Sequence, residues 1–183
     1  GSTGLGRSLA EEVIAAGGKV IATARNIEKV KDLEVKHPKQ AHAARLDVVD
    51  GESINAAIQS GVKTFGRIDV VVNNAGFGSL ASIEDAGRLA FPGIGIYSST
   101  KFAVEGLSEA LALEVAALGI KVMVVEPGAF LTEFMNNANM EHLTETYMPI
   151  YSGLKQMMET TIFGDPQRAA KAMIHAVESG SPI

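Results

Sequence analysis

A tyrosine and a lysine four residues apart, Tyr97 and Lys101, are the side chains of this sequence best suited to acid–base chemistry. At this spacing the two side chains lie on one face of a helix, one turn apart. A free tyrosine titrates near pH ~10, and a neighbouring ammonium group lowers that pKa because it favours the phenolate. The pair is predicted to move a proton to or from a hydroxyl or carbonyl group. The alternative is an ordinary amphipathic tyrosine beside a solvated lysine.

The composition predicts a single globular domain over residues 1–183 that neither binds nucleic acid nor spans a membrane. Hydrophobic residues make up 46% of the sequence, and the net charge is −5 with no basic stripe. No apolar run approaches the ~18 residues of a membrane span, and no His, Asp or Glu cluster has metal-site spacing. The absence of cysteine excludes disulfides and thiolate sites. We therefore expect a cytoplasmic protein without a metal site.

A glycine-rich turn at the start of the sequence is predicted to open a helix. Leu9, Ala10, Val13 and Ile14 recur on one side of that helix, and Gly17-Gly18 would end it. Such a turn places free backbone N–H groups and the positive end of the helix dipole where a phosphate can bind, although a simple tight turn would use the same residues. The candidate phosphate-binding residues are Gly1, Ser2, Thr3, Gly4, Leu5 and Gly6.

Two charged residues follow the next two predicted strands, over 19–24 and 41–46. An acidic residue at the end of the first strand would accept hydrogen bonds from an adenosine ribose and favour NAD, but this chain has Arg25 instead. A guanidinium suits a 2′-phosphate, so Arg25 indicates NADP, the alternative being a solvated loop arginine. Asp47, after the second strand, could hold an adenine amino group or could be a helix-start carboxylate. Between the strands, Asn26 is expected to cap a short polar helix.

Further elements are predicted from apolar periodicity and capping residues. We expect a helix from Asp50, and buried parallel strands over 68–72 and 120–125, because these two runs are almost continuously apolar. A last helix is expected after Asp165-Pro166, an N-cap followed by a proline at the first helical position. The apolar residues expected on the inner face of the helix from Asp50 are Ile54, Ala57, Ile58, Val62 and Phe65.

Four motifs in this order resemble the short-chain dehydrogenase/reductase family, in the branch with a single Rossmann-type domain. They are Gly1–Gly6, Asn73-Asn74-Ala75-Gly76, Tyr97–Lys101 and Pro127-Gly128. The resemblance implies an α/β fold with a doubly wound parallel sheet and a nicotinamide cofactor. It also implies hydride transfer between that cofactor and an alcohol or ketone. Because of Arg25, NADP is expected ahead of NAD.

The resemblance also assigns roles to individual residues. Tyr97 would be the catalytic acid and base, and Lys101 would lower its pKa and hold the nicotinamide ribose. Thr132 matches a threonine that hydrogen-bonds the nicotinamide carboxamide, although it could also be a helix N-cap. The remaining cofactor-binding candidates from the family motifs are Asn74, Ala75, Gly76, Pro127 and Gly128.

The sequence also departs from the family pattern. The family's first strand would precede Gly1, and its last strand would follow Ile183. An interior helix and strand, with the catalytic serine, would lie between about Asp85 and Gly87. We expect these elements to be missing from this sequence rather than from the natural protein, because a doubly wound sheet without an interior strand has unpaired edges and an open core. Ser98 and Ser99 are not predicted to replace the serine, because helix geometry turns them away from Tyr97.

Two segments suggest further roles. The predicted helix over 97–118 is apolar on more than one side, so one face is expected to pair with a second subunit, as in family members. Packing of that helix wholly within the monomer core is the alternative. Residues 130–163 contain five of the seven methionines, and we predict that they form a lid over a partly apolar substrate or a plain helical hairpin.

The function predicted from these residues and from the resemblance is an NADP-dependent oxidoreductase that acts on an alcohol or carbonyl compound. A non-catalytic NADP-binding protein that senses redox state or has a regulatory role is the alternative. Epimerase or dehydratase chemistry on the same scaffold is a third possibility, which would form product without net turnover of the cofactor.

Overall fold

The computed structural model describes residues 2–75, 95–127 and 163–180, together with the single residues 130, 149, 152 and 156. The chain divides into two compact units. One unit consists essentially of Gly1–Gly76 and Gly164–Ser181, and the other of Phe77–Phe163.

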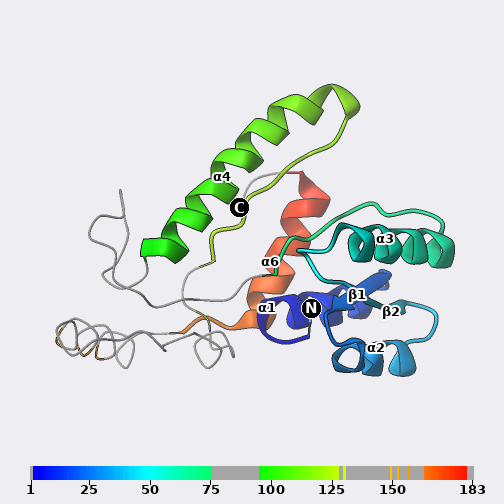
Figure 1. The fold of residues 1–183 in the computed structure, drawn as a ribbon. Helices are drawn as coiled ribbons and strands as arrows, with labels where there is room; N and C mark the ends of the chain where they lie inside the picture. Colours follow the sequence, from blue (N-terminus) through cyan, green and yellow to red (C-terminus); the bar gives the residue numbers. More distant parts are fainter. Residues whose placement is uncertain are drawn as a thin grey trace. The chain divides into compact units, whose positions relative to one another are not determined.

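A parallel sheet forms the centre of the first unit. Its two strands are β1 (Val20–Ala24) and β2 (Ala41–Arg45), and Ala24 lies opposite Arg45 in the register. Both strands confirm the predictions from the sequence. Because the strands are parallel, the residues that follow them lie at the same edge of the sheet (Figure 1).

The connection between the strands contains the 3-10 helix η1 (Ile27–Lys29) and α2 (Lys31–Lys36). The side chain of Asn26 accepts a hydrogen bond from the Glu28 N–H, so the predicted cap is confirmed. The predicted single helix is instead two short helices. The break is at Val30, which is fully buried and anchors the connection in the core.

One face of the sheet packs against α1 (Gly4–Ala15) and α2. The helix α1 ends before Gly17, whose φ of +88° is a left-handed conformation that glycine adopts without strain. This confirms the predicted helix end. The side chains that form the core on this face are Ala10, Ile14, Ala22, Val30, Leu33, Ala41 and Ala43.

The other face of the sheet packs against α3 (Gly51–Phe65), which Asp50 caps by accepting hydrogen bonds from two backbone N–H groups. Ile21, which points to this face, lies so close to Gly61 that a Cβ on Gly61 would be 2.1 Å from the Ile21 Cδ1 atom. The buried residues of α3 are Ser53, Ala57 and Gly61. Small side chains at every fourth position let the helix approach the strands closely.

The inner face predicted for α3 is therefore only partly correct. Ala57 is buried as expected, but Ile58 and Val62 are 46% and 41% exposed. The apolar periodicity of the sequence predicted that the large residues face the sheet. In the structure the small residues face it, because the helix and the strands pack closely. The large residues lie beside the small ones.

The helix α6 (Pro166–Ser179) packs along α1 within the same unit (Figure 1). Asp165 accepts a hydrogen bond of 2.8 Å from the Gln167 N–H, so the predicted N-cap with a following proline is confirmed. Ala170 and Ala176 are the buried residues of this helix. His175 is exposed.

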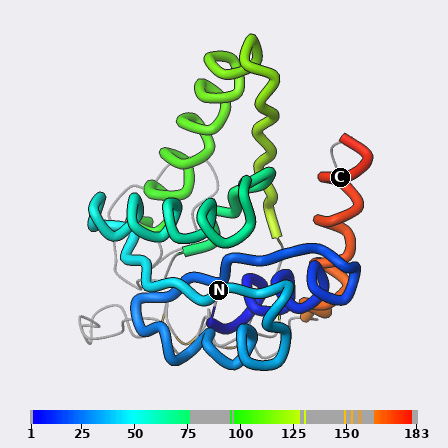
Figure 2. Tube along the Cα trace, turned by 90° about the vertical axis from the view of Figure 1, so that its right-hand side faces the viewer, coloured from blue at the N-terminus to red at the C-terminus, as the bar shows by residue number. Residues whose placement is uncertain are grey.

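The described part of the second unit is a long helix followed by a returning segment. The helix α4 (Gly95–Val115) continues into the 3-10 helix η2 (Ala116–Leu118), which ends at Gly119 with a φ of +73°. Residues 120–127 then run back beside α4, as Figures 1 and 2 both show. The predicted helix over 97–118 is thus confirmed and begins slightly earlier.

The strands predicted over 68–72 and 120–125 were wrong for this chain. Both segments lack strand pairing, and the exposed fraction of Val71 is 73% and that of Ile120 is 54%. A strand needs a neighbouring strand for its backbone N–H and C=O groups, and the described residues place none beside either segment. An apolar run without such a neighbour stays unpaired.

Among the described helices, none combines the length and the apolar character that crossing a bilayer requires.

Candidate functional site

Two of the predicted cofactor-binding residues lie at the carboxyl edge of the sheet. Arg25 directly follows β1, and Asp47 is the second residue after β2. The Leu46 N–H donates to the Ala24 carbonyl at 3.0 Å, which keeps the two chain segments together beyond the strands. Arg25 is exposed and makes no ion pair within the described residues. The edge therefore offers a cation beside a carboxylate.

Asp47 already makes hydrogen bonds within the turn that contains it. Its Oδ1 accepts a hydrogen bond of 3.3 Å from the Val49 N–H, and its backbone N–H donates to the Ser53 hydroxyl at 3.0 Å. The side chain thus closes a turn ahead of α3, whose N-cap is Asp50. The half-buried carboxylate keeps acceptor capacity, because one oxygen can accept more than one hydrogen bond.

The glycine turn opens α1, which begins at Gly4, and the N-terminus of α1 lies toward the same edge because the helix leads back into β1 through a tight turn. Gly4 has a φ of +59°, and Thr3 occupies the N-cap position without a side-chain capping hydrogen bond. The first N–H groups of the helix are thus not capped by that side chain, and they suit a phosphate. Ser2, Leu5 and Gly6 are half-buried around the turn.

An ion pair that the sequence analysis missed joins this turn to α2. The Arg7 guanidinium donates from Nη1 and Nη2 to the two carboxylate oxygens of Asp32 at 2.8 and 2.6 Å, and from Nε to Glu11 at 2.7 Å. These hydrogen bonds hold the pKa of the Asp32 carboxyl far below its usual value and raise that of Arg7. The only signal in the sequence was an arginine directly after the glycine turn, with an aspartate 25 residues later.

Tyr97 and Lys101 lie together on α4, as their spacing predicts. The Lys101 Nζ lies over the Tyr97 ring, 5.5 Å from the ring centroid, where an ammonium group is attracted to the electron-rich face. Tyr97 is half-buried and Lys101 is exposed.

The expected fall in the pKa of Tyr97 is not what this structure shows. Burial raises the pKa of the Tyr97 phenol above 10.0, because the phenolate would lose solvation. The ammonium group over the ring does not offset that loss. The phenol is therefore held neutral in this structure.

The hydroxyls next to Tyr97 are engaged within α4. Ser99 donates to the Gly95 carbonyl at 2.9 Å, and Thr100 donates to the Tyr97 carbonyl at 2.7 Å. One turn after Lys101, the Glu105 carboxyl shares a hydrogen bond with Glu126, and this contact raises the pKa of Glu105 above 4.5. The carboxyl pair links α4 to the segment that ends at Pro127.

Several predicted site residues are exposed or lie outside the described residues. Asn74, Ala75 and Pro127 are described as exposed irregular chain, without the strand ends that were expected to position them. Gly1, Gly76, Gly128 and Thr132 are not among the described residues. The same holds for nearly all of the predicted lid over 130–163.

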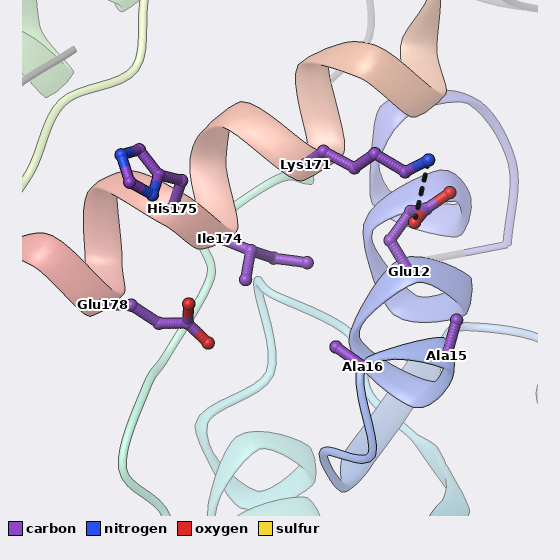
Figure 3. A pocket seen from close by; sticks show the side chains of 7 residues that line it. All are labelled: Glu12, Ala15, Ala16, Lys171, Ile174, His175 and Glu178. Atoms are coloured by element: carbon purple, nitrogen blue, oxygen red, sulfur yellow. Dashed lines mark ion pairs between the residues drawn. The ribbon is translucent and has the colours of Figure 1, made fainter.

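A pocket of about 360 Å³ lies between α1 and α6, and none of its lining residues is a predicted site residue (Figure 3). Lys171 reaches across it to Glu12, with an Nζ–Oε2 distance of 3.9 Å, and Ile174 projects toward α1. The lining also contains Ala15, Ala16, His175 and Glu178. Its two carboxylates outnumber its one lysine, so the lining disfavours the phosphates of a nucleotide cofactor.

Comparison with curated proteins identifies several relatives. The chain is 34% identical to the oxidoreductase BOA17 of Botryotinia fuckeliana and 33% identical to the 3-ketodihydrosphingosine reductase of Bacteroides thetaiotaomicron. The alignments cover 75% and 78% of this chain and 66% of each relative, so the chain spans just under two thirds of their length. The NADPH-dependent 3-dehydrocapnine reductase of Ornithobacterium rhinotracheale is 26% identical over 75% of this chain and 65% of that protein.

These alignments are longer than the part of the chain that they cover. The alignment with BOA17 has 180 positions and that with the Bacteroides enzyme has 189, but neither includes more than 78% of a 183-residue chain. Each relative therefore has many residues within the aligned region that have no counterpart here. This supports the prediction of a missing interior segment.

The fold and the family agree with these relatives. A short-chain dehydrogenase from Streptomyces avermitilis superposes with a TM-score of 0.84 and 33% identity, over 96% of this chain and 80% of that one. The profile of the short chain dehydrogenase family matches residues 1–87 and 84–143, two pieces that meet where the interior helix and strand were predicted to be missing. The chain therefore belongs to the short chain dehydrogenase family, with its α/β, Rossmann-type fold.

Proposed function

We propose that the protein is an oxidoreductase that transfers hydride between NADP(H) and an alcohol or carbonyl substrate, with Tyr97 as acid and base. The observation that carries the proposal is the position of the Lys101 ammonium group over the Tyr97 ring on α4, in a chain of this family. Bound NADP(H) would supply or accept the hydride. The protein would supply the proton.

Tyr97 and Lys101 have complementary roles in this proposal. A neutral phenol donates its proton to a carbonyl oxygen that gains charge as it is reduced, and the phenolate accepts a proton in the reverse direction. Burial keeps Tyr97 neutral in the free protein. Lys101 would stabilise the phenolate formed after donation and would hold the nicotinamide ribose.

The preference for NADP rests on Arg25. Its exposed guanidinium, at the end of β1, has no carboxylate partner within the described residues and is available for a 2′-phosphate. The Ornithobacterium relative is NADPH-dependent by name, which supports the same choice. The uncapped first turn of α1 would bind the pyrophosphate.

The substrate is proposed to be partly apolar. The methionine-rich segment over 130–163 would cover it as a lid, because methionine adapts to varied apolar shapes. The Bacteroides relative is named for a ketone, 3-ketodihydrosphingosine, and this compound belongs in the first set of substrates to test. Homo-oligomerisation through α4 and a cytoplasmic location are proposals as well.

A spectrophotometric assay of NADPH consumption tests the proposal. The purified chain is mixed with NADPH or NADH and a panel that contains 3-ketodihydrosphingosine, a steroid ketone, a fatty ketone and an aromatic ketone. We expect consumption with NADPH that exceeds that with NADH. Tight NADPH binding without consumption would favour the non-catalytic sensor, and product formation without net cofactor turnover would favour an epimerase or dehydratase.

The proposed interior segment has a separate test. The mass of the intact natural protein, measured by mass spectrometry, is expected to exceed the 19.2 kDa of this sequence and to yield peptides that interrupt the Asp85–Gly87 region. Peptides that run unbroken from Asp85 through Gly87 in the natural protein would show a true deletion and would leave the enzyme without the family's serine.

A further inference from the structure

The ion pair between Arg7 and Asp32 connects two elements that the sequence separates by 25 residues. The guanidinium binds both carboxylate oxygens at 2.8 and 2.6 Å, a forked geometry that fixes direction as well as distance. The Arg7 side chain is only 19% exposed, and its third interaction, with Glu11, lies along α1 itself. Arg7 is therefore held in one orientation by two carboxylates.

Each end of this ion pair is close in sequence to a proposed phosphate-binding group. Arg7 is in the first turn of α1, where its own N–H donates to the Thr3 carbonyl at 3.3 Å, directly after the glycine turn. Asp32 is at the start of α2, a few residues after Arg25. On the α2 side, Val30 and Leu33 are almost completely buried, so Asp32 projects from a well-anchored segment.

Arg7 itself is a poor phosphate ligand in this arrangement. Its charge is compensated by Asp32 and Glu11, which together engage Nε and both terminal nitrogens. By contrast, Arg25 has no ion pair within the part of the chain that the structure describes. The two arginines thus differ in role: one is available to a ligand and the other joins two elements.

We propose that Arg7 and Asp32 are positioning residues that set the spacing between the pyrophosphate-binding turn of α1 and the 2′-phosphate-binding Arg25. This inference rests on the proposed cofactor function. A ligand with both a 5′-phosphate and a 2′-phosphate needs both sites at a fixed distance, whereas a ligand with only the 5′-phosphate needs one. Loss of the ion pair should therefore weaken binding of the ligand with both phosphates more than binding of the ligand with only the 5′-phosphate.

The test uses calorimetric titration of the full chain with NADP⁺, adenosine 2′,5′-bisphosphate and 5′-AMP. Asp32→Asn removes the negative charge and one hydrogen-bond acceptor. Arg7→Lys removes the pair of parallel hydrogen bonds but keeps the positive charge. We expect each change to raise the Kd of NADP⁺ and of adenosine 2′,5′-bisphosphate about tenfold, and the Kd of 5′-AMP by much less. A tenfold change corresponds to the loss of one charge-assisted hydrogen bond. The double variant Arg7→Asp with Asp32→Arg should recover part of the affinity.

Two control variants separate positioning from general stability. Glu11→Gln removes only the interaction within α1, and Lys36→Gln removes only the exposed 3.3 Å contact of Asp32 with Lys36. Both variants should leave unchanged the ratio of the Kd of adenosine 2′,5′-bisphosphate to the Kd of 5′-AMP. Circular dichroism and the Tm of every variant establish that titrations are made on folded protein.

Three results would overturn the proposal. If Asp32→Asn lowers the Tm but leaves the Kd ratio unchanged, the pair is structural only. If Asp32→Asn tightens binding of adenosine 2′,5′-bisphosphate, Arg7 is itself a phosphate ligand. If the unmodified chain binds none of the three nucleotides, the cofactor function fails and the positioning role fails with it.

Discussion

Lys101 Nζ lies 5.5 Å from the centroid of the Tyr97 ring, over the face of the ring, and both side chains come from the first half of α4. The contact gives the phenol a cationic neighbour without an intervening element, because a single helical turn separates the two residues. Only the helix has to form for the pair to assemble. The reactive pair is therefore a local feature, whereas the cofactor site needs several elements.

Replacement of Tyr97 by phenylalanine should abolish turnover and preserve cofactor binding. The change removes the hydroxyl and keeps the ring that the ammonium group contacts. We expect kcat to fall roughly 10²–10⁴-fold, the range for loss of a general acid, with the Kd of NADPH within about twofold of the original. Steady-state kinetics and a binding titration check this. Retained turnover in Tyr97→Phe would show that another group transfers the proton.

The ionisation of Tyr97 should occur above pH 10 in the protein without cofactor. Burial favours the neutral phenol in the folded state, so the stability that this preference contributes is present below pH 10.0 and is lost as pH rises through the folded-state pKa. Titration of tyrosinate absorbance, as the difference between the unmodified chain and Tyr97→Phe, gives the midpoint directly. A midpoint below 10 would mean that Lys101 dominates over burial even without the cofactor.

The Arg7–Asp32 ion pair should stabilise the fold at neutral pH and cease to do so in acid. The folded-state pKa of Asp32 is lowered by the Arg7 guanidinium, so the contribution is present above the ordinary carboxyl value of 3.8 and is lost as pH falls through the folded-state pKa. Because Asp32 is 41% exposed, the pair is worth up to about 1 kcal/mol, or about 2–4 °C in Tm. Thermal unfolding of Asp32→Asn between pH 7 and pH 2 measures this loss.

The control for this pH dependence is Asp69→Asn. Asp69 pairs with Arg67, two residues away, and both side chains are largely exposed. The same chemical change there should have little effect on the Tm at any pH, since no second element is held. If Asp32→Asn and Asp69→Asn behave alike at pH 7, the Arg7–Asp32 pair does not stabilise the contact between α1 and α2.

The close contact between Gly61 and Ile21 predicts a sharp effect of adding one methyl group. A Cβ on Gly61 would lie 2.1 Å from Ile21 Cδ1 and 3.0 Å from its Cγ1, so Ile21 or the helix must move. We expect Gly61→Ala to lower the free energy of unfolding by about 1–3 kcal/mol. Gly51→Ala in the same helix meets no atom within 4 Å and should be neutral or slightly stabilising. Urea unfolding of both variants provides the measurement, and equal stabilities would contradict the packing of α3 on β1.

The features that the sequence predicted well are those with local causes. Asp50 and Asp165 begin helices because their side chains accept hydrogen bonds from N–H groups two or three residues later, and Gly17 ends one because it adopts a positive φ. These interactions are complete within one turn of the chain. The spacing of Tyr97 and Lys101 was predictable for the same reason.

The features that were predicted wrongly or missed depend on residues that are distant in the sequence. The apolar runs over 68–72 and 120–125 have the composition of central strands, but a strand exists only beside another strand, and the described residues place none beside these runs. The Arg7–Asp32 pair was missed because opposite charges 25 residues apart are common, and only the packing of α1 and α2 brings these two together. The pKa of Tyr97 depended on burial, which spacing alone does not reveal.

The apolar surface of α4 leads to the last prediction, that the chain associates through this helix. Leu107 is 71% exposed and Leu113 is 82% exposed, and large apolar side chains gathered on one exposed helix mark an interface. Leu107→Glu would place a carboxylate in that interface and should shift the chain to a monomer in analytical ultracentrifugation. Gln59→Glu, on an exposed position of α3, adds the same charge elsewhere and should leave the assembly unchanged. A chain that is already monomeric at high concentration would show that α4 is covered within one subunit.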